Sequence, residues 1–285
     1  MQNITFEAPA NLGEATTLLA KYGGKAIILA GGTDIAPKIN CYELRPETIL
    51  YLGRLGMNAI KEADGGLEIG AGTTLAALME SSLIAQKAPI LLQAAFMHSS
   101  PAIRSAGTIG GNIMNASPAA DMVGPLFVLD AKLVLASSAG ERSVTIGEFF
   151  PGQGKTVCAA NELLKTICIP AVKGGTAFVK LGRRKAQSLS IVSASVRIDA
   201  ENGVCKTARI AFGSMAPTVI RCKKAEQLLE GKKIDAELLR ACAKAAITEC
   251  SPIGDVRASA WYRNEAGQGI MRQALFVAAG LEYTD

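Results

Sequence analysis

Residues 106–121 are the stretch that decides the fold, and they read AGTIGGNIMNASPAAD. These sixteen residues hold three glycines and two asparagines, but no Lys, Arg or Glu. A solvated linker would carry charges, and a core element would not tolerate so much Gly and Asn. Because glycine allows positive φ and close backbone approach, Gly110 and Gly111 can turn consecutive N–H groups toward an anion. Loops of this length tend to be functional.

A second glycine pair lies upstream, in residues 30–34 (AGGTD), directly after the apolar run 26–29. Two Gly-Gly turns with adjacent Thr and Asp could together hold a nucleotide diphosphate. Either segment alone could be only a tight turn. Neither matches G-x-G-x-x-G or G-x-x-x-x-G-K-S/T, the two common phosphate fingerprints. The residues alone therefore indicate a pair of anion-binding loops without naming the ligand.

These two segments resemble the two FAD-diphosphate loops of the flavoprotein subunits of molybdenum hydroxylases, a family that includes xanthine dehydrogenase and carbon monoxide dehydrogenase. Two later segments add to the resemblance. Residues 178–186 (FVKLGRRKA) are similar to the Lys-containing strand of the family, and residues 255–263 (DVRASAWYR) are similar to its C-terminal signature. The four segments span nearly the whole chain in the expected order, so the resemblance is specific.

The resemblance implies a non-covalent FAD and assigns its contacts. The backbone N–H groups of the two glycine pairs are expected to hold the diphosphate, with help from the hydroxyls of Thr33 and Thr108. Hydrogen bonds to charged groups contribute about 1.5–3 kcal/mol each, so a few could dominate affinity. No catalytic residue and no metal ligand is expected in this chain. The expected cofactor contacts are Leu29, Ala30, Gly31, Gly32, Thr33, Asp34, Ile35, His98, Thr108, Ile109, Gly110, Gly111, Asn112, Asn115, Ser117, Asp121, Leu164 and Lys180.

Three of these residues have alternative interpretations. Asp121 accepts hydrogen bonds from the sugar-like part of the ligand by resemblance, but it could equally cap the helix that follows. Lys180 would lie near the isoalloxazine ring, where a cation stabilises negative charge on reduced flavin; otherwise it belongs to a solvated strand end. His98 is the only histidine. It is either a structural residue or, as the family alignment suggests, packed on the flavin.

The resemblance implies the electron-exit subunit of a molybdenum hydroxylase. Substrate would be oxidised at molybdopterin on a large partner subunit. Electrons would then pass through [2Fe–2S] clusters on a small partner subunit to FAD here, and leave to NAD or another acceptor. Two alternatives remain: a stand-alone FAD oxidoreductase, and a non-enzymatic nucleotide-binding assembly module.

Composition narrows the class of protein further. The 285 residues carry a net charge of +5, with 49% hydrophobic and 19% charged residues. No run of eighteen apolar residues suggests a membrane span, and the first residues do not resemble a signal peptide. The basic cluster at 180–185 is too short for a nucleic-acid footprint. We therefore expect a cytoplasmic protein that binds no nucleic acid.

Seven cysteines are scattered without a C-x-x-C pair. An odd number without a secretory signal argues for reduced thiols. Iron–sulfur clusters need four thiolates, usually closely spaced. Most of these cysteines stand singly in apolar patterns, where Cys behaves as a small hydrophobe. No cluster is therefore expected in this chain.

Length suggests two or three domains, and the order of elements predicts an α+β fold. We expect residues 1–54 to form a small α/β part of the FAD-binding domain and residues 55–172 its larger α+β part. Residues 173–285 would form a C-terminal domain of an antiparallel three-stranded sheet with helices.

Local signals place the elements. Asn11 is a candidate N-cap, residues 64–66 a hairpin turn, and Gly231 the residue after a helix. Residues 106–121 are expected to form a loop. The expected helices are 12–19, 75–79, 90–97, 123–129, 221–229, 236–248 and 258–279, and the expected strands 4–6, 26–29, 48–52, 59–63, 67–71, 132–136, 163–169, 177–181, 190–198 and 206–212.

Overall fold

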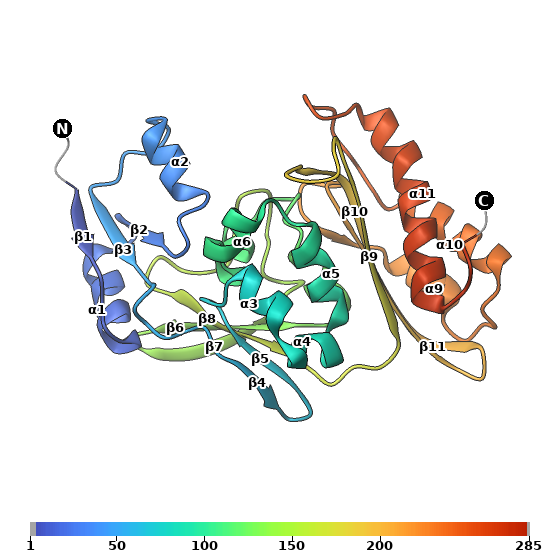
Figure 1. Ribbon diagram of the computed structural model, residues 1–285, viewed down its shortest axis with the longest axis horizontal. Coiled ribbons are helices and arrows are strands. Elements are labelled where there is room, and N and C mark those ends of the chain that lie inside the picture. The colour runs from blue at the N-terminus through green and yellow to red at the C-terminus, as the bar shows by residue number, and fades with distance from the viewer. Residues whose placement is uncertain (1–3, 284–285) are drawn as a thin grey trace.

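A computed structural model describes residues 4–283 as three β-sheets, each with its own helices, that follow one another along the longest axis of the molecule (Figure 1). The N-terminal elements lie at one end, and the helices of the C-terminal unit lie at the other. The predicted α+β class is confirmed. Within residues 4–283, no helix is both long enough and apolar enough to cross a membrane.

The first sheet is parallel, with strand order β1-β3-β2. Asn11 begins α1 as predicted, because its side chain accepts a hydrogen bond from the amide of Glu14 at 2.9 Å. The small core under α1 includes Ala136 and Leu163 from the second sheet, so the first two units share an apolar contact. The elements are β1 (Thr5–Glu7), α1 (Leu12–Tyr22), β2 (Ala26–Leu29), α2 (Ile35–Asn40) and β3 (Thr48–Tyr51).

The second sheet is antiparallel, with order β4-β5-β8-β6-β7. Its first hairpin turns at Asp64 and Gly65, whose φ values of 48° and 75° fit a type I′ turn, as the sequence predicted. Six short helices belong to this unit, and all but α6 contribute buried residues to the largest core. The elements are β4 (Ile60–Ala63), β5 (Gly66–Gly70), α3 (Leu75–Glu80), α4 (Ser82–Lys87), α5 (Pro89–Met97), α6 (Pro101–Ala106), α7 (Ile109–Met114), α8 (Val123–Val128), β6 (Lys132–Ser137), β7 (Gly140–Thr145) and β8 (Leu163–Ile169).

The third sheet lies between helices of two units. α11 packs on β9 and β10 from one side, while α8 of the second unit packs on β10 and β11. β10 is buried along most of its length for this reason. The three expected strands are present, and the two-residue β12 extends them to a sheet of order β12-β11-β10-β9. The elements are β9 (Gly175–Gly182), β10 (Ser190–Glu201), β11 (Val204–Gly213), β12 (Ile220–Arg221), α9 (Lys223–Leu229), α10 (Ala236–Ile247) and α11 (Ala260–Ala279).

Charge also joins the second and third units. Asp130, in the turn after α8, meets one arginine from each of three strands of the third sheet. Arg197 of β10 lies 2.7 Å from its carboxylate, Arg209 of β11 3.0 Å and Arg221 of β12 3.1 Å. Arg197 also donates to the carbonyl of Val128 at 2.7 Å. These bonds fix the third sheet on the second unit.

The prediction of a continuous loop at residues 106–121 is wrong. The segment contains α7, which Thr108 caps with its side chain. Glycine disfavours a helix, but tertiary packing overrides that preference here because Gly110 lies directly on Ala71. Four further elements of six residues each were not predicted, namely α2, α4, α6 and β7.

Candidate functional site

The loop from β2 to α2 leaves a row of backbone N–H groups without a protein acceptor. The amides of residues 31–34 donate no hydrogen bond to any acceptor among residues 4–283. Gly32 has a φ of 72°, and its carbonyl accepts from the amide of Ala36 at 2.9 Å, which closes the first turn of α2. Because unpaired N–H groups at a helix start attract anions, this loop fits a diphosphate.

The structure brings the two glycine-containing segments into direct contact. A Cβ placed on Gly31 would lie 1.9 Å from the carbonyl oxygen of Ala106, so only glycine permits this approach. A Cβ on Gly107 would lie 3.3 Å from Oγ1 of Thr33. Two segments far apart in the sequence are therefore neighbours at the start of α7.

The glycine pair of the second segment is bonded differently from what the sequence suggested. Gly111 donates its amide to Oγ1 of Thr108 at 3.0 Å, and Gly110 donates its amide to the carbonyl of Ala71 at 2.9 Å. Both amides therefore bond within the protein instead of pointing at a ligand. Gly110 is buried, whereas Gly111 of α7 and Asn115, which follows α7, are exposed.

The residues after α7 fold back toward it and end at Asp121. Oδ1 of Asn112 accepts from the amide of Met122 at 3.2 Å. Oγ of Ser117 accepts from the amide of Ala119 at 3.2 Å, which stabilises the turn between them. These two bonds hold the backbone on both sides of Asp121 in place relative to α7.

Asp121 collects side chains from three other elements. Its carboxylate lies 2.7 Å from Nζ of Lys180 on β9, 2.9 Å from Nδ1 of His98 at the end of α5, and 2.7 Å from Oγ of Ser190 on β10. The side chains of Asp121 and Lys180 are each only 4% exposed, so this is a buried ion pair. Lys180 also donates to the carbonyl of Met97 at 3.3 Å.

The partners of Asp121 decide its charge. Burial on its own would raise the pKa of the Asp121 carboxyl, because it disfavours the ionised form. The hydrogen bond from His98 and the positive charge of Lys180 oppose burial and outweigh it, so the pKa lies below its ordinary value. The carboxylate is therefore ionised at neutral pH. It accepts a hydrogen bond from Nδ1 of His98, whose side chain is 21% exposed.

The interpretation of Asp121 as a helix cap is wrong, since α8 has Met122 at its N-cap position and no side-chain cap. Lys180 does not lie at a solvated strand end either, because Asp121 holds it in the interior.

Ser190 was not singled out from the sequence, although it completes the set around Asp121. The pairing of β10 with β9 shifts register between Ser190 and Val192, and bulges of this kind turn a side chain in a new direction. No local pattern marks the bulge, because β10 reads as an ordinary buried strand.

The remaining expected contacts lie around these two groups. Leu29 ends β2 and Ile35 begins α2, on either side of the first loop. Leu164 belongs to β8, and its side chain is buried in the core shared with Ile109 of α7. Any contact of Leu164 with a ligand would therefore have to use its backbone.

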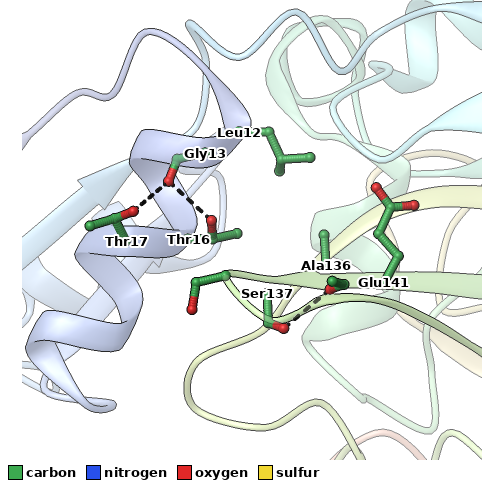
Figure 2. A pocket seen from close by; sticks show the side chains of 9 residues that line it. Leu12, Gly13, Thr16, Thr17, Ala136, Ser137 and Glu141 are labelled. Carbon is green, nitrogen blue, oxygen red and sulfur yellow. Dashed lines mark hydrogen bonds between the residues drawn. The ribbon is translucent and has the colours of Figure 1, made fainter.

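A cavity of about 320 Å³ lies elsewhere, between α1 and the β6–β7 hairpin (Figure 2). The hydroxyls of Thr16 and Thr17 point into the helix and donate to the carbonyl of Gly13 at 3.1 and 2.8 Å. None of the expected cofactor contacts lines this cavity.

The thiols are not arranged as ligands. All seven cysteines are free, and burial raises the pKa of Cys205 to about 11 and that of Cys242 to about 12. Such thiols stay protonated at neutral pH. Over residues 4–283, no group of three or more His, Cys, Asp or Glu side chains is placed to hold a metal ion.

Comparisons with known proteins agree with this architecture. Residues 2–172 match the family described as the FAD binding domain in molybdopterin dehydrogenase, and residues 177–276 match the CO dehydrogenase flavoprotein C-terminal domain. The carbon monoxide dehydrogenase medium chain of Hydrogenophaga pseudoflava is 32% identical over 276 residues, which is 96% of each chain. The xanthine dehydrogenase FAD-binding subunit of Escherichia coli O157:H7 is 33% identical over 264 residues, or 91% of this chain and 90% of that one.

A solved structure extends the similarity to three dimensions. The carbon monoxide dehydrogenase from Hydrogenophaga pseudoflava that lacks the Mo-pyranopterin moiety of the molybdenum cofactor superposes with a TM-score of 0.94. The match covers 98% of each chain at 32% sequence identity.

Fold and site together define a flavoprotein component of an oxidoreductase. More particularly, the chain belongs to the family of FAD-binding subunits of the molybdenum hydroxylases. The resemblance read from the four sequence segments is thereby confirmed, and so is the expectation of an oxidoreductase component. The same matches support FAD as the cofactor.

Proposed function

We propose that the chain holds FAD between residues 30–35 and residues 108–121, and that it passes electrons through this FAD. One observation carries the proposal. The contact of Gly31 with Ala106 brings the unbonded amides of residues 31–34 beside the start of α7. In this scheme those amides bind the diphosphate, and the exposed face of α7 at Gly111 lies along the ligand.

The residues around Asp121 belong to the flavin end of the proposed site. FAD supplies hydride and single-electron exchange when it is bound. Lys180 provides the positive charge that favours a negatively charged reduced ring, and Asp121 keeps that ammonium in place. His98, 21% exposed, offers Nε2 and an aromatic face for packing on the ring.

The proposed electron route includes partner subunits. Electrons enter from [2Fe–2S] clusters on a small subunit and leave to NAD or another acceptor, while substrate is hydroxylated at molybdopterin on a large subunit. Relatives described as medium chains support this arrangement. We expect this chain to contribute no cluster ligands, since among residues 4–283 no three His, Cys, Asp or Glu side chains are placed to hold a metal ion.

The site also predicts non-covalent attachment of FAD. Neither Cys41 nor any other thiol lies in the segments proposed to hold the cofactor, and His98 is bonded through Nδ1 to Asp121. Acid precipitation of the yellow protein should therefore release all of the flavin into the supernatant, where its absorbance is measured. Flavin that stays with the pellet would contradict the prediction.

Replacing Gly111 separates ligand binding from folding. A Cβ on Gly111 would meet only Oγ1 of Thr108, at 3.0 Å, whereas a Cβ on Gly110 would lie 2.5 Å from the carbonyl oxygen of Ala71. Gly111→Leu should weaken FAD binding about a hundredfold, or roughly 3 kcal/mol, because its side chain occupies the surface along which the ligand lies. Gly110→Ala should instead mainly lower the melting temperature. Fluorescence titration with FAD and thermal unfolding measure the two effects.

The control for Gly111→Leu is Gly147→Leu, at an exposed glycine with nothing within 4 Å of an added Cβ. If Gly111→Leu kept full FAD affinity while its melting temperature collapsed, the segment would be structural and the proposed site wrong.

If nicotinamide is the acceptor, FAD-loaded protein should reduce an electron-accepting dye with NADH. The reaction runs the exit step in reverse and needs only the flavin of this chain. Dye reduction is followed by absorbance, with protein stripped of FAD as the control. Fully loaded protein without this activity would count against NAD and favour a quinone or another acceptor.

Copurification tests the proposed partners. A tag on this chain expressed in its own host should retain a molybdenum-containing subunit and an iron–sulfur subunit in fixed proportion. A chain that elutes alone, carries FAD and oxidises a substrate without molybdenum would instead be the stand-alone FAD oxidoreductase.

A further inference from the structure

The polar network around Asp121 continues into the C-terminal unit through Ser190. The Ser190 side chain is fully buried, and its hydroxyl donates to Oδ1 of Asp121 at 2.7 Å. Its backbone carbonyl accepts two further hydrogen bonds, from Oγ of Ser214 at 3.1 Å and from Nη1 of Arg257 at 3.3 Å. The backbone of Ser190 is therefore fixed by these two bonds, while its hydroxyl contacts Asp121 at the proposed flavin end of the site.

A partly buried carboxylate–guanidinium group completes this support. Asp255 binds Arg257 through Nε at 2.9 Å and Arg263 through Nη2 at 2.8 Å. Arg263 is 1% exposed and donates to the carbonyl of Ile191. The hydrogen bond from Arg257 lowers the pKa of Asp255 well below its ordinary value, despite an opposing contribution from burial. We call Asp255, Arg257 and Arg263 the C-terminal clamp.

The strand itself explains why the clamp is needed. The pairing of β10 with β11 begins only at Ser193, and the bulge against β9 falls between Ser190 and Val192. The carbonyls of Ser190 and Ile191 therefore lack partners from the β11 side. Buried carbonyls need hydrogen-bond donors, and the two clamp arginines and Ser214 are the donors here.

We infer that Ser190 is a positioning residue for the flavin chemistry, in which the C-terminal clamp holds Ser190, Ser190 orients the Asp121 carboxylate, and Asp121 orients Lys180 and His98 toward the flavin. The inference rests on the proposed function. It gives the segment at residues 255–263 a role in the site, although that segment lies in a different unit from the two FAD loops. Loss of the Ser190 hydroxyl leaves one carboxylate oxygen without its partner, so that Asp121 rotates more freely.

The single histidine offers a probe of this orientation. Because the sequence has only His98, its ring nitrogens give unambiguous signals in ¹⁵N NMR of the full chain. A bond from Nδ1–H to Asp121 fixes the Nδ1–H tautomer of the neutral ring, and a reoriented carboxylate releases it. The tautomer ratio therefore reports the geometry of Asp121 even without FAD.

The matched pair of variants is Ser190→Ala and Ser195→Ala. Both serines are buried on β10, but the hydroxyl of Ser195 has no hydrogen-bond partner among residues 4–283. Ser190→Ala should lower the Nδ1–H fraction of His98 and weaken FAD binding about tenfold. Ser195→Ala should leave both unchanged. Arg257→Met, which removes one support of the Ser190 carbonyl, should shift the tautomer in the same direction by a smaller amount.

The outcomes are distinguishable. If Ser190→Ala lowers the melting temperature but leaves the His98 tautomer as in the wild type, Ser190 is structural and the inference is overturned. An equal tautomer change in Ser195→Ala would also overturn it. If Ser190→Ala does not fold, an unchanged tautomer in Arg257→Met overturns the inference, and a shifted one supports it. Failure of the wild-type chain to bind FAD would refute the proposed function, while the tautomer measurement would still test the link from Ser190 to Asp121.

Discussion

Gly31→Ala is expected to abolish stable FAD binding. The added methyl would lie 1.9 Å from the carbonyl oxygen of Ala106, 2.6 Å from its carbonyl carbon and 3.0 Å from Cα of Gly107. All three atoms belong to the backbone, so no change of rotamer relieves the overlap, and the two FAD segments must move apart. We expect affinity to fall by more than about a hundredfold, or roughly 3 kcal/mol, measured by fluorescence titration with FAD.

A chemically identical control is available at Gly147. This glycine is exposed, and an added Cβ would have nothing within 4 Å. Gly147→Ala should bind FAD as the wild type does. Another exposed glycine, Gly140, would be a poorer control, because its φ of 130° would strain any side chain. Wild-type affinity in Gly31→Ala would mean that the contact between the segments does not form the binding site.

Among the single variants proposed here, Asp121→Asn should produce the largest loss of folding stability. The change keeps the shape of the side chain but leaves the ammonium of Lys180, which is 4% exposed, without its counter-charge. Breaking a buried ion pair on one side costs about 3–5 kcal/mol. Urea unfolding measures this cost, and the double variant Asp121→Asn, Lys180→Met should recover most of it, since neither charge of this pair then remains.

The exposed pair of Lys165 and Glu141 is the control for this variant. Their side chains are 36% and 45% exposed, so Glu141→Gln should cost less than about 1 kcal/mol. If Asp121→Asn were equally mild, the Asp121 carboxylate would not be the buried counter-ion that the structure indicates.

The same variant predicts a pH dependence. The pKa of Asp121 is lowered in the folded state, so its ionised form stabilises the fold above about pH 4, the ordinary aspartate pKa. That contribution is lost as the pH falls through the lowered value. The difference in unfolding free energy between wild type and Asp121→Asn should therefore be largest near neutral pH and shrink on acidification. If this difference in unfolding free energy grew on acidification, the pKa of Asp121 would be raised in the folded state and not lowered.

Local sequence signals predicted much of the fold because those elements depend on neighbouring residues. Asn11 caps α1, the turn at Asp64 and Gly65 closes the first hairpin, and Gly231 follows α9 with a φ of 77°. Four helices were missed, α2, α4, α6 and α7, and each has only six residues, which is less than about two turns in which an apolar period could show. The side chains of Ser81, Ser100 and Thr108 cap three of them.

The bonding of the two glycine segments could be predicted only in part from the sequence. The first glycine loop has the free amides that the sequence suggested. The amides of Gly110 and Gly111 are instead used within the protein, because a neighbouring strand end and a helix cap accept them. Ser190 escaped notice because its role depends on a bulge and on two distant arginines. These residues are far apart in the sequence, so no local pattern predicts that they meet.

The junction at Asp130 limits how freely the C-terminal unit can be exchanged during evolution. Three guanidinium groups from separate strands converge on this single carboxylate, in a turn where Asp130 has a φ of 52°. A recombinant that joins everything up to β8 from one lineage to the following sheet from another keeps the two parts docked only if both parents carry matching charges at these four positions. We therefore expect a change at Asp130 to weaken the docking of the third sheet unless the three arginines change with it.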